Sequence, residues 1–208
     1  MKRFIIADDH SIVRRGIREI IQDAYPEARI EEAGDAETLL HLVSQQPPDL
    51  VITDLSMPGR SGLDAIQQIR QMHPRLPVIV LSMYPEDQYA VRALKSGASG
   101  YLNKETAPDE LVNAVRQVLQ GKKYITGAVA EKLYGLLTTG SQPPYQLLSD
   151  REFEVFKQIA GGKSISQIAE QLSLSATTIS TYRARILEKL DLKTNADLTR
   201  YAMEMQLL

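Results

Sequence analysis

Phe4-Ile5-Ile6-Ala7-Asp8-Asp9 is a short apolar run that ends in two acidic residues. Between this run and the later apolar runs lie helical patterns, with apolar residues three and four positions apart. The later runs cover residues 28–33, 50–52, 78–81 and 101–102. Strands that alternate with helices predict a parallel sheet covered by helices on both faces. We therefore expect five strands and five helices in residues 1–122, with the half-charged residues 28–33 at an edge of the sheet.

The rest of the chain changes character. Residues 126–137 have a short helical pattern, and a turn-rich stretch follows them, so we expect a linker with one helix over residues 123–143. Residues 144–208 contain no strand pattern and predict four helices, over 150–160, 164–172, 176–190 and 194–205. Ser149 and Glu152 have the spacing of a capping box at the first of these helices. A short helix, a turn and a longer helix are typical of a helix-turn-helix domain.

Composition limits the class of protein. The 208 residues are 43% apolar and 24% charged, which are ordinary values for a folded protein. Cysteine is absent, which excludes disulfides and thiolate metal sites. No apolar run has the length of a membrane span and no signal peptide is evident, so we expect a cytoplasmic protein without membrane contact.

The net charge of −2 is unusual for a protein that binds nucleic acid. It is unevenly distributed, because residues 1–122 hold 14 basic and 17 acidic residues, whereas residues 144–208 hold eight of each. We therefore expect any DNA-binding surface to depend on a few local cations, with modest affinity per monomer and a need for dimerisation.

Polar side chains follow four of the expected strands. Asp8 and Asp9 end the first strand, Asp54 the third and Ser82 the fourth, and Lys104 comes soon after the fifth. Ligands of open parallel sheets bind at these carboxyl ends. Clustered carboxylates need a divalent cation, and oxygen ligands favour Mg²⁺, which suits phosphoryl transfer. A single Asp at a strand end is as often a helix cap or a turn former, so the prediction depends on the whole set.

Several motifs in the first 122 residues resemble those of a response-regulator receiver domain: Ile5-Ile6-Ala7-Asp8-Asp9-His10, Val51-Ile52-Thr53-Asp54-Leu55-Ser56-Met57-Pro58-Gly59, Leu81-Ser82 and Gly100-Tyr101-Leu102-Asn103-Lys104. Three later motifs resemble a LuxR-type DNA-binding domain: Leu148-Ser149-Asp150-Arg151-Glu152, Ile165-Ser166-Gln167-Ile168-Ala169 and Ile186-Leu187-Glu188-Lys189-Leu190. Together they are similar to the NarL/FixJ family of two-component regulators. The resemblance implies a flavodoxin-like (βα)5 receiver, a linker helix and a four-helix LuxR-type domain.

The resemblance also implies a role for each residue of the acidic site. Asp54 would accept a phosphoryl group from a sensor histidine kinase, and Lys104 would pair with the phosphoryl oxygens. Ser82 would move to hydrogen-bond that group, and Tyr101 would swing inward behind it as an aromatic switch. Mg²⁺ would be held by Asp8, Asp9, Asp54 and the main-chain carbonyl of Ser56. The protein would then be a switch and not an enzyme.

Tyr84, two residues after Ser82, is large where water would approach a phosphoryl group. It therefore suggests slow self-dephosphorylation, although it can equally pack on the loop.

One face of the helix expected at 176–190 is polar or small and suits a DNA groove. It carries Thr177, Ser180, Thr181, Ala184 and Arg185, and Arg185 is the best candidate for a contact to guanine. Arg183 and Lys189 are candidate phosphate contacts, with an intramolecular ion pair as the alternative for Arg183. Many members of the family carry Lys at position 180 and His at position 182, so contacts known from them do not transfer to Ser180 and Tyr182.

The last helix has an apolar stripe that includes Leu198, Ala202 and Met205. In this family such a stripe serves dimerisation on double-stranded DNA, and we expect a homodimer in the active state. Packing in the core would also explain most of the stripe.

Two other readings remain open. An atypical regulator would work without phosphorylation, but such proteins tend to lose one of the acidic residues, and this chain keeps the set. A phosphatase-like enzyme with an aspartate nucleophile would generally carry a second Asp two residues after the first, and Ser56 stands there.

Overall fold

The computed structural model describes residues 1–57, 61–139 and 143–208. The chain divides into two compact units, residues 1–135 and 136–208, which are treated separately here. In the described ranges, no helix combines the length and the apolar character that crossing a membrane would require.

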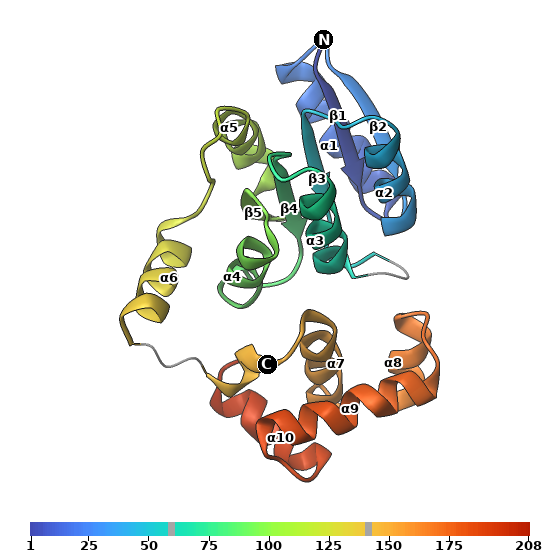
Figure 1. The fold of residues 1–208 in the computed structure, drawn as a ribbon, viewed down its shortest axis with the longest axis vertical. Helices are drawn as coiled ribbons and strands as arrows, with labels where there is room; N and C mark the ends of the chain where they lie inside the picture. Colours follow the sequence, from blue (N-terminus) through green and yellow to red (C-terminus); the bar gives the residue numbers. More distant parts are fainter. Residues whose placement is uncertain (58–60, 140–142) are drawn as a thin grey trace. The chain divides into compact units, whose positions relative to one another are not determined.

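A parallel five-stranded sheet in the order β2-β1-β3-β4-β5 forms the centre of the first unit (Figure 1). The strands are β1 (Arg3–Ala7), β2 (Arg29–Ala33), β3 (Leu50–Thr53), β4 (Val78–Ser82) and β5 (Gly100–Asn103). The predicted parallel α/β fold is confirmed, and the half-charged β2 lies at an edge, as expected. Strands β1, β3 and β4 are buried along their whole length, because helices cover both faces of the sheet.

Five helices alternate with the strands: α1 (Ser11–Ala24), α2 (Ala36–Gln45), α3 (Gly62–Met72), α4 (Glu86–Ser96) and α5 (Ala107–Leu119). A large cluster of buried apolar side chains joins α1 and α5 to the sheet, with Phe4, Ile21, Ile52 and Leu111 fully or almost fully buried. The Asp35 side chain caps α2 by accepting a hydrogen bond from the Thr38 amide.

The chain continues along β5 after α5. The Tyr124 amide donates to the Ser99 carbonyl over 2.9 Å, and Tyr124 pairs with Gly100 in an isolated bridge. A Cβ atom at Gly100 would lie only 3.0 Å from the Cβ atom of Tyr124, so this approach favours glycine there. Helix α6 (Gly127–Thr139) follows, and the division between the units falls within it. Of the turn-rich stretch predicted after this helix, residues 140–142 lie outside the described ranges.

The second unit consists of helices. A short 3-10 helix, η1 (Pro144–Leu147), precedes α7 (Asp150–Ala160), α8 (Ile165–Gln171), α9 (Ala176–Leu190) and α10 (Asn195–Glu204). The predicted capping box of Ser149 and Glu152 is present, and Ser164 with Gln167 forms a second one. Between α8 and α9, Ser173 adopts a positive φ of 53°, in the tight turn of the expected helix-turn-helix arrangement.

Glu152 links two helices of this unit. Its carboxylate is buried and lies 2.6 Å from the Lys189 ammonium of α9, and it also accepts from the Ser149 amide over 2.7 Å. Burial alone would raise the pKa of Glu152, but the hydrogen bonds from Lys189 and Ser149 outweigh it and hold the pKa below its usual value. The ionised carboxylate therefore stabilises the contact between α7 and α9.

Replacing Glu152 with Gln removes this charge and is expected to lower the opening free energy of α7 by about 1–2 kcal/mol at pH 7. Because the pKa is lowered in the folded state, the stabilisation exists above the usual pKa of 4.5 and is lost as the pH falls through the folded-state value. Hydrogen exchange of the α7 amides in the full chain, corrected for intrinsic rates, measures both effects. Glu170→Gln, at an exposed position of α8, is the matched control.

Candidate functional site

Asp8 and Asp54 lie side by side at the carboxyl edge of the sheet. Ala7 of β1 is paired with Thr53 of β3, so the residues that follow these two leave the sheet together. The Asp54 amide donates to the Ala7 carbonyl over 2.8 Å, which fixes this alignment beyond the strands. Both carboxylates are buried, with only 1% of the Asp8 side chain and 4% of the Asp54 side chain exposed. The sheet therefore brings two acids together away from bulk water.

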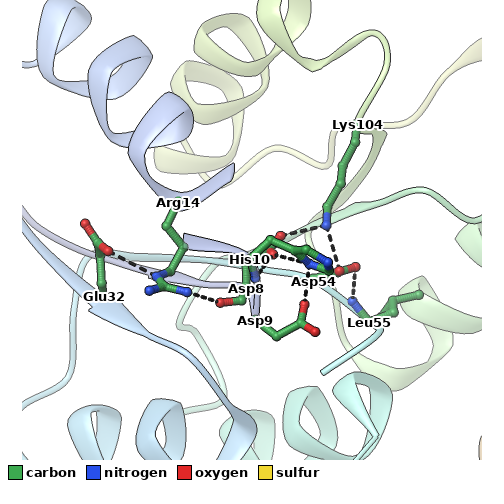
Figure 2. Close-up of polar contacts among 8 residues, drawn as sticks. All are labelled: Asp8, Asp9, His10, Arg14, Glu32, Asp54, Leu55 and Lys104. Atoms are coloured by element: carbon green, nitrogen blue, oxygen red, sulfur yellow. Dashed lines mark hydrogen bonds and ion pairs between the residues drawn. The ribbon is translucent and has the colours of Figure 1, made fainter. Parts of the chain in front are cut away.

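Lys104 bridges the two acids (Figure 2). Its Nζ atom lies 2.6 Å from Oδ2 of Asp8 and 2.7 Å from Oδ2 of Asp54. Burial disfavours the charged amine, but hydrogen bonding to Asp54 and Asp8 outweighs it and raises the pKa of Lys104 above its usual value. The ammonium ion therefore offsets one of the two buried negative charges, and it lies within reach of any group attached to Asp54.

The second oxygen of Asp54 is held by its own loop. The Leu55 amide donates to Oδ1 of Asp54 over 2.6 Å, and the Gly62 amide donates to the Leu55 carbonyl over 3.2 Å. The first residue of α3 therefore lies in close contact with the main chain of Asp54 and Leu55. A Cβ atom at Gly62 would lie 2.6 Å from both the Asp54 carbonyl oxygen and the Leu55 Cα, so a side chain does not fit there.

Asp9 and His10 form the open side of the site. Nδ1 of His10 lies 2.7 Å from Oδ1 of Asp9, and the His10 amide donates to Oδ1 of Asp8 over 2.8 Å. The His10 side chain is 66% exposed, whereas that of Asp9 is 28% exposed. Arg14 donates to the Asp8 carbonyl over 2.7 Å and pairs with Glu32, so a side chain of α1 fixes the turn after β1 (Figure 2).

The donor set fits a hard divalent cation. Ligand atoms of Asp8, Asp9 and His10 lie within 4.8 Å of one another, whereas the Asp54 carboxylate lies outside this group and shares with Asp8 the contact to the Lys104 ammonium. Oδ2 of Asp8 is buried without a partner in hydrogen-bond geometry, although the Lys104 ammonium lies close to it. A buried carboxylate oxygen with spare capacity, next to two further carboxylates, is suited to Mg²⁺.

The neighbouring strand ends hold the hydroxyl groups. Ser82 is fully buried, and its Oγ accepts from the Tyr84 amide over 3.3 Å. The Tyr101 side chain points inward and is 1% exposed, and its hydroxyl donates to the Tyr84 carbonyl over 2.8 Å. Burial raises the pKa of Tyr101, against the smaller opposite effect of its hydrogen bond with Ser82. The inward position expected for Tyr101 in the switched state is therefore the one seen here.

Tyr84 stacks on Tyr89 of α4, with ring centroids 4.4 Å apart. Tyr84 therefore packs against α4, and its effect on the rate of self-dephosphorylation stays a prediction.

Residues that follow the loop after β4 also contact the linker helix α6 and the residue before it. Glu86, the first residue of α4, accepts a hydrogen bond from the Thr126 hydroxyl over 2.8 Å, and Lys132 of α6 donates to the Asp87 carbonyl. Ser82 is only four residues from Glu86 along the chain. The loop after β4 therefore leads within a few residues to the contacts that hold α6. The sequence contained no recognisable signal for these contacts, nor for that of Arg14.

The expected DNA-facing residues of α9 share an exposed surface. Thr177, Ser180, Thr181, Ala184 and Arg185 are all exposed. Ile179, Ile186 and Leu190 are buried on the other side, as the helical spacing predicted. The hydroxyls of Ser180 and Thr181 donate to main-chain carbonyls of their own helix and keep acceptor capacity. This face is therefore available for a partner.

Two of the predicted phosphate contacts have partners within the unit. Nε of Arg183 donates to Oδ1 of Asn195 over 2.6 Å, and Arg183 forms no ion pair, its alternative role, with any residue in the described ranges. The Lys189 ammonium is bound to Glu152, as described above. Both cations are less available to DNA than Arg185.

The stripe on α10 requires a correction. Leu198 and Ala202 are completely buried inside the unit, so their side chains serve the core and cannot themselves contact a second copy. Met205 and the neighbouring Met203 are exposed, by 38% and 63%. Helical spacing identified the stripe, but it could not separate a core face from an interface, because both are apolar.

Two family models match the chain. Residues 4–116 match the response regulator receiver domain, and residues 146–202 match the bacterial regulatory proteins of the luxR family. Both matches coincide with the structural features above, since the first covers the acidic site and the second covers α7 to α9.

Individual relatives are similar over nearly the whole chain. The response regulator UvrY of Escherichia coli K12 is 33% identical over 205 residues, covering 98% of this chain and 94% of that protein. The oxygen regulatory protein NreC of Staphylococcus carnosus is 34% identical over 214 residues, covering 99% of each. RcsB of Salmonella enterica serovar Typhimurium, bound to a promoter with a phosphomimetic, has a TM-score of 0.65 at 29% identity, with 97% of this chain and 98% of that chain covered.

Substituting Ala for Gly62 is expected to destabilise the first unit by about 1–3 kcal/mol, because the new Cβ must displace main-chain atoms next to Asp54. Gly16→Ala is the matched control, since nothing lies within 4 Å of a Cβ there and the helix interior favours Ala. Hydrogen exchange of the β3 amides measures the change. Equal protection in the two variants would show that the contact at Gly62 does not constrain the loop.

Proposed function

Because the chain belongs to the response regulators that join a receiver domain to a LuxR-family DNA-binding domain, we propose that phosphorylation of Asp54 controls DNA binding by the second unit. The observation that carries this proposal is the Asp54 carboxylate, buried and 2.7 Å from the Lys104 ammonium, at the carboxyl edge of the sheet. The donor is a phosphohistidine on a sensor histidine kinase.

Asp54 acts as the nucleophile. One of its carboxylate oxygens forms a bond to phosphorus while the bond from phosphorus to the histidine nitrogen breaks, and the imidazole leaves with the electron pair. Lys104 is placed to balance the charge of the phosphoryl oxygens throughout. Oδ1 is oriented by the Leu55 amide, so the loop presents the carboxylate in one position.

Asp8, Asp9, Asp54 and the main-chain carbonyl of Ser56 are the proposed ligands of Mg²⁺. When bound, Mg²⁺ neutralises negative charge on the phosphoryl oxygens. Asp8 is fixed by the His10 amide and by the Arg14 contact to its carbonyl, which explains why it keeps its orientation. Asp9 is more exposed and completes the set from the solvent side.

The phosphoryl group changes the hydrogen bonds of Ser82. It adds up to two negative charges and three acceptor oxygens next to a buried hydroxyl, which then donates to it. The Tyr84 amide donates to the same hydroxyl, so a movement of Ser82 toward the phosphoryl group shifts Tyr84, and Tyr101 is bonded to the Tyr84 carbonyl. The change passes to Glu86 and so to Thr126 at the start of the linker helix.

DNA is contacted by the exposed face of α9, with Arg185 as the principal reader of base edges. Thr177, Ser180, Thr181 and Ala184 line the rest of the groove-facing surface. Structures of RcsB include complexes with DNA and dimers on DNA, which supports a homodimer as the binding form of this chain. The exposed apolar side chains of the predicted stripe are Met203 of α10 and Met205, which directly follows this helix. These two residues are the candidates for that contact.

Phosphorylation is expected to raise DNA affinity about tenfold, a typical coupling between two sites. The measurement is a gel shift of a genomic fragment selected by the phosphorylated full chain, with and without acetyl phosphate and Mg²⁺. Asp54→Asn keeps the acceptor for the Leu55 amide but lacks the nucleophile, so its affinity should not respond to the phosphodonor.

An unchanged wild-type affinity in this experiment would contradict control by phosphorylation and favour an atypical regulator. An equal response of the wild type and Asp54→Asn would place the acceptor elsewhere.

Arg185→Ala is expected to weaken binding to the selected fragment by about 1–3 kcal/mol and to relax discrimination among sequences. Arg200→Ala removes the same charge from an exposed position of α10, and we expect a much smaller loss. Comparable losses in the two variants would mean that α9 supplies only general electrostatic attraction. Fluorescence anisotropy at two salt concentrations separates these outcomes.

A further inference from the structure

A cavity of about 320 Å³ lies at the end of the sheet opposite to Asp54. Its lining includes Pro77 and Ser99, which come shortly before β4 and β5 respectively. Asp54 follows the carboxyl end of β3, so a strand length of roughly 16 Å separates the cavity from the acidic site. The cavity is therefore a separate feature of the first unit.

Four cationic side chains line this cavity. They come from three segments: Arg70 lies in α3, Arg75 in the connection to β4, and Lys122 and Lys123 directly after α5. None of the lining residues that the structure describes is acidic. Residues far apart in the sequence thus place like charges around one small space, which costs energy unless a counter-charge is present.

Part of this positive charge serves the fold. Arg70 donates to the Pro74 carbonyl, and Lys123 donates to the Ala98 carbonyl over 2.6 Å. Cations near the carboxyl ends of helices are also favourable in themselves. Arg75 and Lys122 also follow helix ends, but they are exposed and form neither a hydrogen bond nor an ion pair through their side chains within residues 1–57, 61–139 and 143–208, so their charges remain available to a ligand.

Ser99 contributes a polar group without a protein partner. The residue is 7% exposed, and its amide and carbonyl are used by Val78 and Tyr124. Its hydroxyl makes no hydrogen bond to any residue that the structure describes, yet the residue lines the cavity. The hydroxyl is not among the completely buried atoms without a partner, so it is reachable from the cavity and can donate to a ligand there.

The charge in the cavity is not neutralised by the protein. Burial lowers the pKa of the Lys123 ammonium, and the nearby Arg70 guanidinium lowers it further. A lysine next to a carboxylate would shift in the other direction.

We propose that this cavity binds a small phosphorylated molecule. Its lining offers ammonium, guanidinium and hydroxyl donors, and the ligand that suits these donors carries several negative charges and acceptor oxygens. The volume is at the lower end of the range for small-molecule sites, which fits a phosphate or pyrophosphate group with a small substituent and excludes a peptide or a duplex. This site is independent of the phosphorylation of Asp54.

Titration of the isotope-labelled full chain with inorganic pyrophosphate tests the proposal, in buffer with EDTA so that no divalent cation links the probe to the acidic site. We expect saturable NMR shifts at the amides of Ser99, Gly121 and Lys122. Ser99→Ala removes a hydroxyl that has no protein partner, so it should leave the fold intact and weaken binding about threefold. Arg75→Ala should weaken binding about tenfold.

Arg15→Ala, an exposed position on α1 with the same loss of charge, is the matched control and should bind as the wild type does. Equal weakening by Arg75→Ala and Arg15→Ala would overturn the proposal, because the probe would then respond only to overall charge. Shifts confined to α9, or no saturation at millimolar pyrophosphate, would overturn it as well.

Discussion

The ammonium ion of Lys104, held between the buried carboxylates of Asp8 and Asp54, is the interaction on which the first unit depends. Two buried carboxylates at adjacent strand ends repel each other. The cation between them lowers the electrostatic energy of this arrangement. It also leaves the cluster with a net negative charge that a divalent cation can balance. The same contact places a cation beside Asp54, the carboxylate that we propose as the phosphoryl acceptor.

Much of this arrangement could be predicted from the sequence, because the parallel direction of the strands follows from simple rules. Apolar runs that alternate with helical patterns imply a parallel sheet, and acids at the ends of two such runs must share one edge. The half-charged edge strand and the capping box of Ser149 and Glu152 were equally readable, since each depends on a few neighbouring residues. The family resemblance added residue roles that periodicity alone does not supply.

The remaining features depend on tertiary contacts, which leave no periodic signal. Arg14 reaches the Asp8 carbonyl across a turn, and Thr126 reaches Glu86 over 40 residues. Leu198 and Ala202 were assigned to an interface, but they fill the core, since an apolar stripe looks the same in both cases. Lys189, a candidate phosphate contact, is paired with Glu152, and no local pattern in the sequence indicates that pair. Arg185, which is exposed on α9, is therefore the cation on which the proposed DNA contact depends most.

Identification of the phosphorylated side chain tests the central claim most directly. The full chain is treated with acetyl phosphate and Mg²⁺ and then reduced with borohydride, which converts an acyl phosphate of aspartate into homoserine. Mass spectrometry of the peptides then locates the product. The account predicts homoserine at position 54 alone, and homoserine at Asp8 or Asp9, or none at all under conditions that change DNA affinity, would contradict it.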